Sequence, residues 1–453
     1  VNKAGIYEVA FCKGGRWQRV VVDDYIPTYS WGTHPCFSQN HDLEIWVMIL
    51  EKAYAKLHGS YLRLKTGSAE SAFEDLTGYP IREFMFDSAK VSKELETTAF
   101  WDRMVRYFKS NYLMCVLTGD ASEVSWSEKE TGLITGHYYT LLDAKYKHGK
   151  RLLKLRNPWG QTEWLGDWSD YSSCWNDQLK QSFDWTAVDD GDFWMSYDDF
   201  KYYFVGLGVC KFNENWHDHR IAMKVNQLKR YKLVVSKPTY IILGVHQLDA
   251  RVLHAKKYNR CGMMLMDAKH NIIMDTPLVL ERTAKGEAYN VPPGTYYLSS
   301  HLPYLKEDGH EEKQDEFHVS IHSTTPLELS PTTFSMVSDL GTIWSQRCHQ
   351  VGELYSSVDL SAIEKNSRVD IFTYSPDLTA ADHSLAAIWI TKKKHKRPLI
   401  LETNYTLHNM VKIRDAQEIK LLPNKITFLG RVAQKSSSNQ GYCSFSVGFS
   451  VYN

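Results

Sequence analysis

The sequence predicts an α+β region over residues 1–212, followed by two all-β sandwich domains over residues 213–325 and 326–453. In the first half, segments with helical periodicity alternate with strand-like runs. After Trp216, short apolar strands follow one another with turn residues such as Pro292-Pro293-Gly294 between them, as in a β-sandwich. With 453 residues, the chain is also longer than one ordinary hydrophobic core requires.

A hairpin and a helix are predicted at the start of the chain. Residues 5–11 and 16–23 alternate between apolar and polar side chains around Gly14-Gly15, which is typical of a β-hairpin. Residues 42–57 place apolar side chains at helical spacing, and we expect Asn40 or Asp42 to cap this helix.

The rest of the first region supplies a second helix and a sheet. The helix is predicted over residues 97–110. The runs NYLMCVLTG, HYYTLLDAKY and RLLKLRN predict strands, because continuous apolar runs of this length are typical of a buried sheet.

Two sets of short strands make up the predicted sandwiches. The first set covers residues 231–236, 239–248, 261–267, 295–302 and 316–322. The second set contains the runs FTY, AAIWIT, ITFLGRV and YCSFSVGFSVY. The spacing of these strands places the domain boundaries near residues 213 and 325.

Composition limits the classes of function. Lys+Arg and Asp+Glu both total 53, so overall charge gives no reason to expect nucleic acid as a partner. No apolar run approaches the 18 or so residues of a membrane span. Eight cysteines without CxxC pairs favour a reduced intracellular protein, so we expect a cytoplasmic location. The sequence begins at Val1 without a leader pattern, and we expect further protein ahead of it.

His137 and Asn157 are the first candidates for catalysis. If the strand after Thr135-Gly136-His137 pairs antiparallel with the strand ending at Arg156, across a turn at Lys147–Gly149, both side chains lie at one sheet end. An amide oxygen that accepts from one imidazole nitrogen leaves the other nitrogen as a base. This is half of a Cys-His-Asn thiol protease site. A polar pair with only a structural role at a strand end is the alternative.

Three longer segments contain these residues and identify a family. GHYYTLLDA, LLKLRNPWGQTEWLGDWSD and DDGDFWMSYDDF resemble the second protease subdomain of calpains, which are calcium-dependent cysteine proteases. GRWQRVVVDDYIPT, LEIWVMILEKAYAKLHGSY and FEDLTGYP resemble the segments before it. The resemblance implies a papain-like fold, with His137 and Asn157 as catalytic residues and Trp159 as the tryptophan beside them. It also implies that both β domains are C2-like sandwiches of the calpain type, and two in tandem resemble the calpain-7-like branch.

The nucleophile of the family is missing from this sequence. In calpains it lies in a QGxxGDCW-type motif ahead of the segment GIYEVAF, and residues 1–453 contain no such motif. Cys36 lacks the following Trp and the upstream Gln, while Cys115 and Cys12 fall in predicted strands. Two hypotheses remain. The protein is either a calcium-regulated endopeptidase that performs limited proteolysis, or a non-proteolytic scaffold that binds protein partners, for instance on the cytoskeleton. A Gln…Cys-Trp pattern ahead of Val1 would favour the enzyme.

A run of acidic residues provides a candidate metal site. Between Glu163 and Asp199 the sequence has ten acids and one base, Lys180. Calcium prefers six to eight oxygen ligands from carboxylates, carbonyls and water. A solvated acidic surface is the alternative. The family resemblance implies a calcium site formed by Glu163, Asp170, Asp190, Asp192 and the backbone carbonyl of Val188.

Two charged segments are weaker candidates. EDGHEEKQDE, residues 307–316, resembles the acidic loop of calpain β-sandwich domains, although any solvated hairpin tip has such a composition. KKKHKR, residues 392–397, has the charge to contact phosphoinositide or an acidic partner, although its composition favours a solvated loop.

Overall fold

The computed structural model describes most of the first 332 residues and the strands of the last hundred or so. The described residues are 3–32, 34–39, 44–224, 230–249, 258, 262–269, 271–276, 281–300, 316–332, 353–359, 368–374, 382–390, 399–408, 410–415, 418–421, 426–434 and 442–450. Two compact units are present: Leu64–Glu214, and Val1–Arg63 together with Asn215–Asn453. The predicted domain boundaries near 213 and 325 stay predictions.

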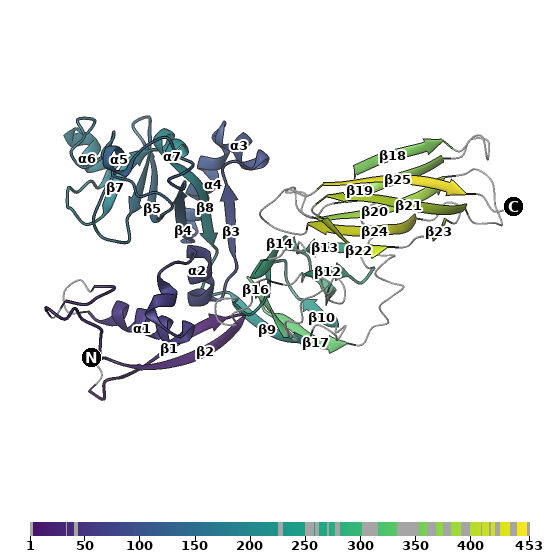
Figure 1. Cartoon of the computed structure of the whole chain (residues 1–453), viewed down its shortest axis with the longest axis horizontal. Helices are drawn as coiled ribbons and strands as arrows, with labels where there is room; N and C mark the ends of the chain where they lie inside the picture. The colour runs from purple at the N-terminus through teal and green to yellow at the C-terminus, as the bar shows by residue number, and fades with distance from the viewer. Residues whose placement is uncertain are drawn as a thin grey trace. The chain divides into compact units, whose positions relative to one another are not determined.

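The unit Leu64–Glu214 is built on a six-stranded antiparallel sheet in the order β3-β8-β4-β5-β6-β7 (Figure 1). Its strands are β3 Ile81–Met85, β4 Leu113–Thr118, β5 Tyr138–Lys147, β6 Lys150–Arg156, β7 Asp192–Ser196 and β8 Phe204–Cys210. Its helices are α2 Ala69–Thr77, α3 Ala89–Leu95, α4 Ala99–Lys109, α5 Glu128–Thr131, α6 Asp177–Phe183 and α7 Tyr197–Tyr203. The predicted strands β4, β5 and β6 and the helix α4 are thereby confirmed.

Both faces of this sheet are covered, which explains its continuous apolar runs. Successive side chains of a strand point to opposite faces. On β6, Leu153 and Leu155 belong to the main core with Phe100 and Met104 of α4. Leu152 belongs to a second cluster with Trp168, Trp175, Trp194 and the α6 residues Leu179 and Phe183. Adjacent positions of one strand must therefore both be apolar.

Residues 215–332 form two antiparallel sheets that contribute to one hydrophobic core. One sheet has the order β14-β11-β16-β9 and the other β13-β12-β15-β10-β17. Their strands are β9 His217–Lys224, β10 Arg230–Val235, β11 Thr239–His246, β12 Met263–Asp267, β13 Ile272–Asp275, β14 Thr283–Val291, β15 Gly294–Ser300, β16 Glu316–Ser323 and β17 Leu327–Thr332. The strands predicted from apolar runs are present, whereas β9, β13, β14 and β17 were not predicted. Polar residues interrupt the patterns of β9 and β14.

The predicted N-terminal hairpin and helix are both present. Strands β1 Ile6–Lys13 and β2 Arg16–Asp23 pair across Gly14 and Gly15, whose φ angles are +57° and +76°, as a tight hairpin turn requires. Helix α1, Trp46–His58, begins later than expected, with Ile45 as its N-cap and no side-chain cap. Asn40 and Asp42, the expected caps, lie outside the described residues.

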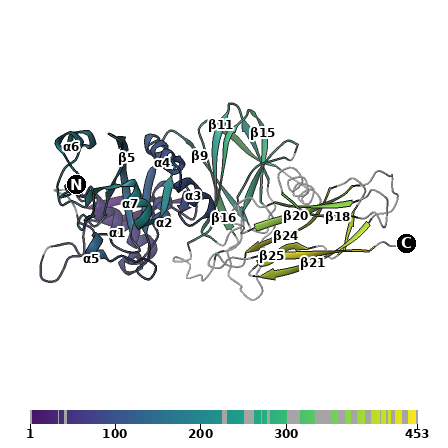
Figure 2. The same cartoon turned by 90° about the horizontal axis from the view of Figure 1, so that it is seen from above.

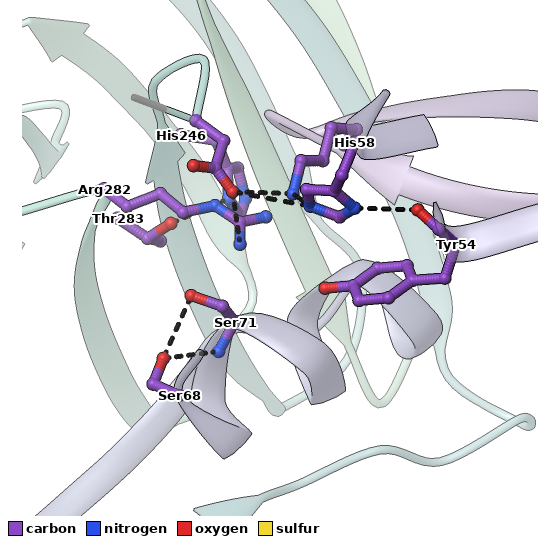
Figure 3. A network of polar contacts seen from close by, with 9 residues as sticks. Tyr54, His58, Ser68, Ser71, His246, Arg282 and Thr283 are labelled. Atoms are coloured by element: carbon purple, nitrogen blue, oxygen red, sulfur yellow. Dashed lines mark hydrogen bonds and ion pairs between the residues drawn. The ribbon is translucent and has the colours of Figure 1, made fainter. Parts of the chain in front are cut away.

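A buried polar network joins the hairpin and helix α1 to the strands that follow residue 215. Lys13 Nζ donates to Asp249 Oδ2 at 2.6 Å and to His58 Nε2 at 2.7 Å, and His58 Nδ1 donates to the carbonyl of Tyr54 at 2.9 Å (Figure 3). Arg282 Nη1 lies 3.8 Å from the same Asp249 oxygen. The side chains of Lys13 and Asp249 are only 3% and 2% exposed. Buried charges of this kind are stable only when they are paired.

The turn of the hairpin packs closely against β11 and β16. A Cβ atom at Gly15 would lie 2.7 Å from His318 Cβ and 2.9 Å from His246 Cδ2, so no larger residue fits there. The guanidinium of Arg220 on β9 donates to the carbonyl of Gly15 at 3.0 Å and to Cys12 Sγ at 2.9 Å. Segment 1–63 is thus held against residues 215–332 by the close approach at Gly15, by the Lys13–Asp249 ion pair and by the hydrogen bonds of Arg220.

The last part of the chain is also antiparallel β structure (Figure 2). One sheet has the order β18-β19-β20-β24-β22 and the other β23-β21-β25. Their strands are β18 Glu353–Asp359, β19 Arg368–Tyr374, β20 Asp382–Ile390, β21 Leu399–His408, β22 Met410–Asp415, β23 Glu418–Leu421, β24 Ile426–Gln434 and β25 Tyr442–Ser450. Residues 307–315 of the acidic segment and the basic segment 392–397 lie outside the described residues. Among the helices that the structure describes, none has the length and apolar character needed to cross a membrane.

Candidate active site

The hairpin formed by β5 and β6 places His137 and Asn157 at the same end of the sheet. The two strands pair antiparallel, with Thr140 opposite Arg156 and Lys147 opposite Lys150. His148 and Gly149 form the turn, with φ angles of +50° and +74°. His137 directly precedes β5 and Asn157 directly follows β6. The predicted turn and the predicted strand pairing are therefore confirmed.

The two side chains form a hydrogen bond. His137 Nε2 lies 3.0 Å from Asn157 Oδ1. Asn157 is fully buried, and its Nδ2 donates to the carbonyls of Gln161 at 2.7 Å and Thr162 at 3.1 Å. Because Nδ2 uses both of its hydrogens there, Oδ1 faces the imidazole and accepts from Nε2–H. The imidazole Nδ1 then holds a lone pair that can accept a proton.

Two aromatic rings enclose the imidazole. The ring centroid of Trp159 lies 4.6 Å from that of His137 at an interplanar angle of 50°, and Tyr139 contacts the imidazole edge-on at 5.1 Å. Trp159 remains 58% exposed, so it covers the pair from the solvent side. Burial lowers the pKa of His137 below its usual 6.5, and the hydrogen bond to Asn157 and the carboxylate of Glu128 oppose this shift. The lowered pKa favours the neutral imidazole, which is the form that a base requires.

Two residues that hold His137 were not predicted from the sequence. The hydroxyl of Thr118, at the end of β4, accepts from the backbone N–H of His137 at 2.9 Å and donates to the carbonyl of Ile134 at 2.7 Å. Glu128 accepts from the N–H and hydroxyl of Thr135 at 3.0 and 2.9 Å. The role of Thr118 depends on strand register and leaves no local signal. Glu128 follows Ser127, which forms a capping box with Glu130, so the S-x-x-E pattern predicts its short helix.

The predicted metal ligands lie in the loops next to this pair. Glu163 Oε1 accepts from the backbone N–H groups of Asp190 at 3.1 Å and Gly191 at 2.8 Å, and the carbonyl of Val188 accepts from Asp190 at 2.8 Å. Asp190 Oδ1 accepts from the backbone N–H of Asp192 at 3.0 Å. Glu163, Val188, Asp190 and Asp192 are thus joined by one set of hydrogen bonds.

Electrostatics differ among these acids. Burial, and then repulsion from Glu163, raise the pKa of Asp170 to about 6, and burial also raises the pKa of Glu163. Asp192, in contrast, pairs with Lys154 at 3.0 Å and Arg156 at 2.7 Å. Within the part of the chain that the structure describes, no three of these acids bring carboxylate oxygens within 4.8 Å of one another. Their role as calcium ligands stays a prediction.

The buried cysteines are unlike a protease nucleophile. Cys115 is buried on β4, and burial raises the pKa of its thiol to about 12. Burial likewise raises the pKa of Cys210 to about 11, and Cys12 is fully buried. A thiolate nucleophile requires a lowered pKa and access to substrate, so Cys115 and Cys210 behave as core residues. Cys36 is partly exposed and lies in a loop, where its backbone N–H donates to the carbonyl of Pro27 at 2.9 Å.

Comparison with known proteins agrees with this geometry. The calpain family cysteine protease model matches residues 1–211. The chain is 39% identical over 213 residues to the calpain-type cysteine protease DEK1 of Arabidopsis thaliana, which covers 46% of this chain and 10% of that relative. It is 36% identical over 248 residues to calpain-9 of Rattus norvegicus, which covers 52% of this chain and 34% of that relative. The chain thus spans about a third or less of the length of these relatives. Residues 1–211 are thus similar in sequence to the calpain family of cysteine proteases.

Proposed function

We propose that this chain supplies the base and the orienting amide of a calpain-type cysteine endopeptidase, an intracellular enzyme that cleaves protein substrates at a limited number of sites. The hydrogen bond between His137 and Asn157 is the observation that carries the proposal. It combines the correct tautomer, a buried amide and a covering indole in one place. The nucleophilic thiol would come from a calpain-type segment outside residues 1–453.

We infer a step for each residue from this geometry. His137 Nδ1 would take the proton of the thiol, and the resulting thiolate would attack the carbonyl carbon of the peptide bond. His137 would then give this proton to the leaving amine. Asn157 holds the ring orientation and stabilises the imidazolium through Nε2–H. Trp159 limits the access of water to this hydrogen bond.

The finer architecture is part of the proposal. We infer a papain-like subdomain in the protease region, followed by two C2-like β-sandwich domains. Two sheets with one shared core over residues 215–332 support the first sandwich. The strand order in residues 353–450 supports the second. Such domains would offer surfaces for protein partners or for phosphoinositide.

Casein cleavage tests the protease proposal. Residues 1–453 alone should leave casein intact, with or without calcium, because a base without thiolate and oxyanion donors does not break a peptide bond. Fusion of a calpain-type Cys-bearing segment ahead of Val1 should produce cleavage that a thiol-alkylating reagent abolishes. A fusion that is folded and inactive would instead favour the non-proteolytic scaffold. Cleavage by residues 1–453 that is lost in Cys36→Ser would show that Cys36 is the nucleophile.

Calcium is the proposed regulator, bound by Glu163, Asp170, Asp190, Asp192 and the Val188 carbonyl. The donor set suits a hard cation because it consists of oxygen atoms. Burial and neighbouring carboxylates raise the pKa of Glu163 and Asp170, and a bound cation would stabilise their ionised forms. Asp192 fits less well, since Lys154 and Arg156 already pair with it. A bound cation would offset the repulsion among the carboxylates.

Calorimetric titration with calcium tests this site without any activity measurement. We expect the wild-type chain to bind calcium and Asp190→Asn to bind at least about tenfold more weakly, because one charged ligand is lost. Asp184→Asn is the matched control. It removes an acid of the same segment that pairs with Lys145, and asparagine tolerates its φ of +55°. Equal affinity in all three proteins, or no heat from the wild type, would contradict the assignment.

A further inference from the structure

The backbone of Asn157 rests directly on the peptide of Gly191. The N–H of Asn157 donates to the carbonyl of Gly191 at 2.9 Å. Gly191 has a φ of +86°, and a Cβ atom there would lie 2.8 Å from the carbonyl oxygen of Asn157 and 2.9 Å from Gly160 Cα. No side chain therefore fits at position 191 between the backbone of Asn157 and that of Gly160. The backbone position of Asn157 therefore depends on the position of the Gly191 carbonyl.

Glu163 holds the backbone on the N-terminal side of that carbonyl. Its Oε1 accepts from two consecutive backbone N–H groups, those of Asp190 and Gly191. Hydrogen bonds to a carboxylate are stronger than those to a neutral acceptor. Thr162, the residue before Glu163, contributes a second link, because its carbonyl accepts from Asn157 Nδ2 at 3.1 Å.

The backbone of Glu163 is itself fixed by the end of helix α5. A Cβ atom at Gly132, the C-cap of α5, would lie 1.9 Å from the carbonyl oxygen of Glu163. Two residues further on, the N–H of Leu165 donates to the carbonyl of Thr131 at 2.9 Å. The carboxylate of Glu163 thus extends from fixed backbone, as a positioning group must.

We propose that Glu163 is a positioning residue for the His137–Asn157 pair, and that it acts through the backbone of Asp190 and Gly191 in the absence of any metal ion. The proposal rests on the protease function for its significance, and it adds a role to Glu163 that differs from ligating calcium. Without the carboxylate, the N–H groups of Asp190 and Gly191 lose their shared acceptor, the Gly191 carbonyl that supports Asn157 loses its fixed position, and the imidazole loses its fixed orientation.

The imidazole N–H of His137 reports on this chain of contacts. The full chain would be labelled with ¹⁵N-histidine and observed by NMR in EDTA, and a His137→Gln variant would assign the resonance. We expect the Nε2–H of His137 to exchange with solvent about tenfold faster or more in Glu163→Ala, the factor that corresponds to one lost charge-assisted hydrogen bond. Glu163→Gln keeps an acceptor oxygen and should restore near wild-type exchange. Glu123→Ala removes an exposed carboxylate and should change nothing.

Two results would overturn the proposal. One is unchanged His137 exchange in folded Glu163→Ala. The other is an equally large increase of the His137 exchange rate in Glu163→Gln and in Glu163→Ala. This result would mean that the charge of Glu163 acts and not its hydrogen bonds. If Glu163→Ala does not fold, Glu163→Asp replaces it, because the shorter side chain keeps the charge and cannot reach both N–H groups. Unchanged exchange in Glu163→Asp would then reject the role. These readouts need neither thiol, substrate nor calcium, so their failure leaves the protease proposal to the casein experiment.

Discussion

Replacement of Asp249 by alanine is expected to lower the free energy of unfolding of the unit that contains it by about 3–5 kcal/mol, the range for breaking a buried ion pair. Asp249 is 2% exposed and accepts from the ammonium group of Lys13 at 2.6 Å. The variant leaves the ammonium group of Lys13 buried beside His58 Nε2 without the carboxylate of Asp249. Hydrogen exchange measured on β1, β2 and α1 should show the loss, because this pair joins them to the later strands.

Two further proteins make the Asp249 result specific. Glu8→Ala breaks the exposed pair with Arg19 on the same hairpin and should change stability by less than about 1 kcal/mol. The double variant Lys13→Met with Asp249→Ala removes both charges and should be more stable than Asp249→Ala alone. A double variant that is less stable than Asp249→Ala would show that the single variant acts through lost packing.

Local signals explain why the catalytic pair could be predicted from the sequence. The turn residues at 147–149 fix the register of β5 against β6, and the register fixes which residues meet at the far end of the hairpin. His137 and Asn157 are twenty positions apart in the sequence and still belong to one local structure. The same reasoning predicted the hairpin at Gly14-Gly15.

Long-range burial explains what the sequence could not predict. Lys13 precedes a Gly-Gly turn and has the pattern of an exposed hairpin residue, yet its partner Asp249 lies 236 positions away. The acidic segment shows the same limit. Its composition suggests a cation site, but β7 was not predicted as a strand, and its pairing with β6 places Asp192 opposite Arg156. No periodicity of the sequence indicates which carboxylates accept from backbone and which pair with bases.

Substitution of His137 in a protein that carries the thiol should have the largest effect on activity. We expect His137→Ala to lower kcat/KM for peptide cleavage by roughly 10⁴-fold or more, because the thiol then loses its base and the leaving amine loses its acid. Asn157→Ala should cost about 10- to 100-fold, since one hydrogen bond to the charged imidazole contributes about 1.5–3 kcal/mol. Thr118→Ser keeps the hydroxyl that accepts from the N–H of His137 and serves as the control with little change. Equal losses for the His137 and Asn157 variants, with folding intact, would mean that the amide does more than orient the ring. Retained activity in His137→Ala would remove the basis for assigning the base to this residue.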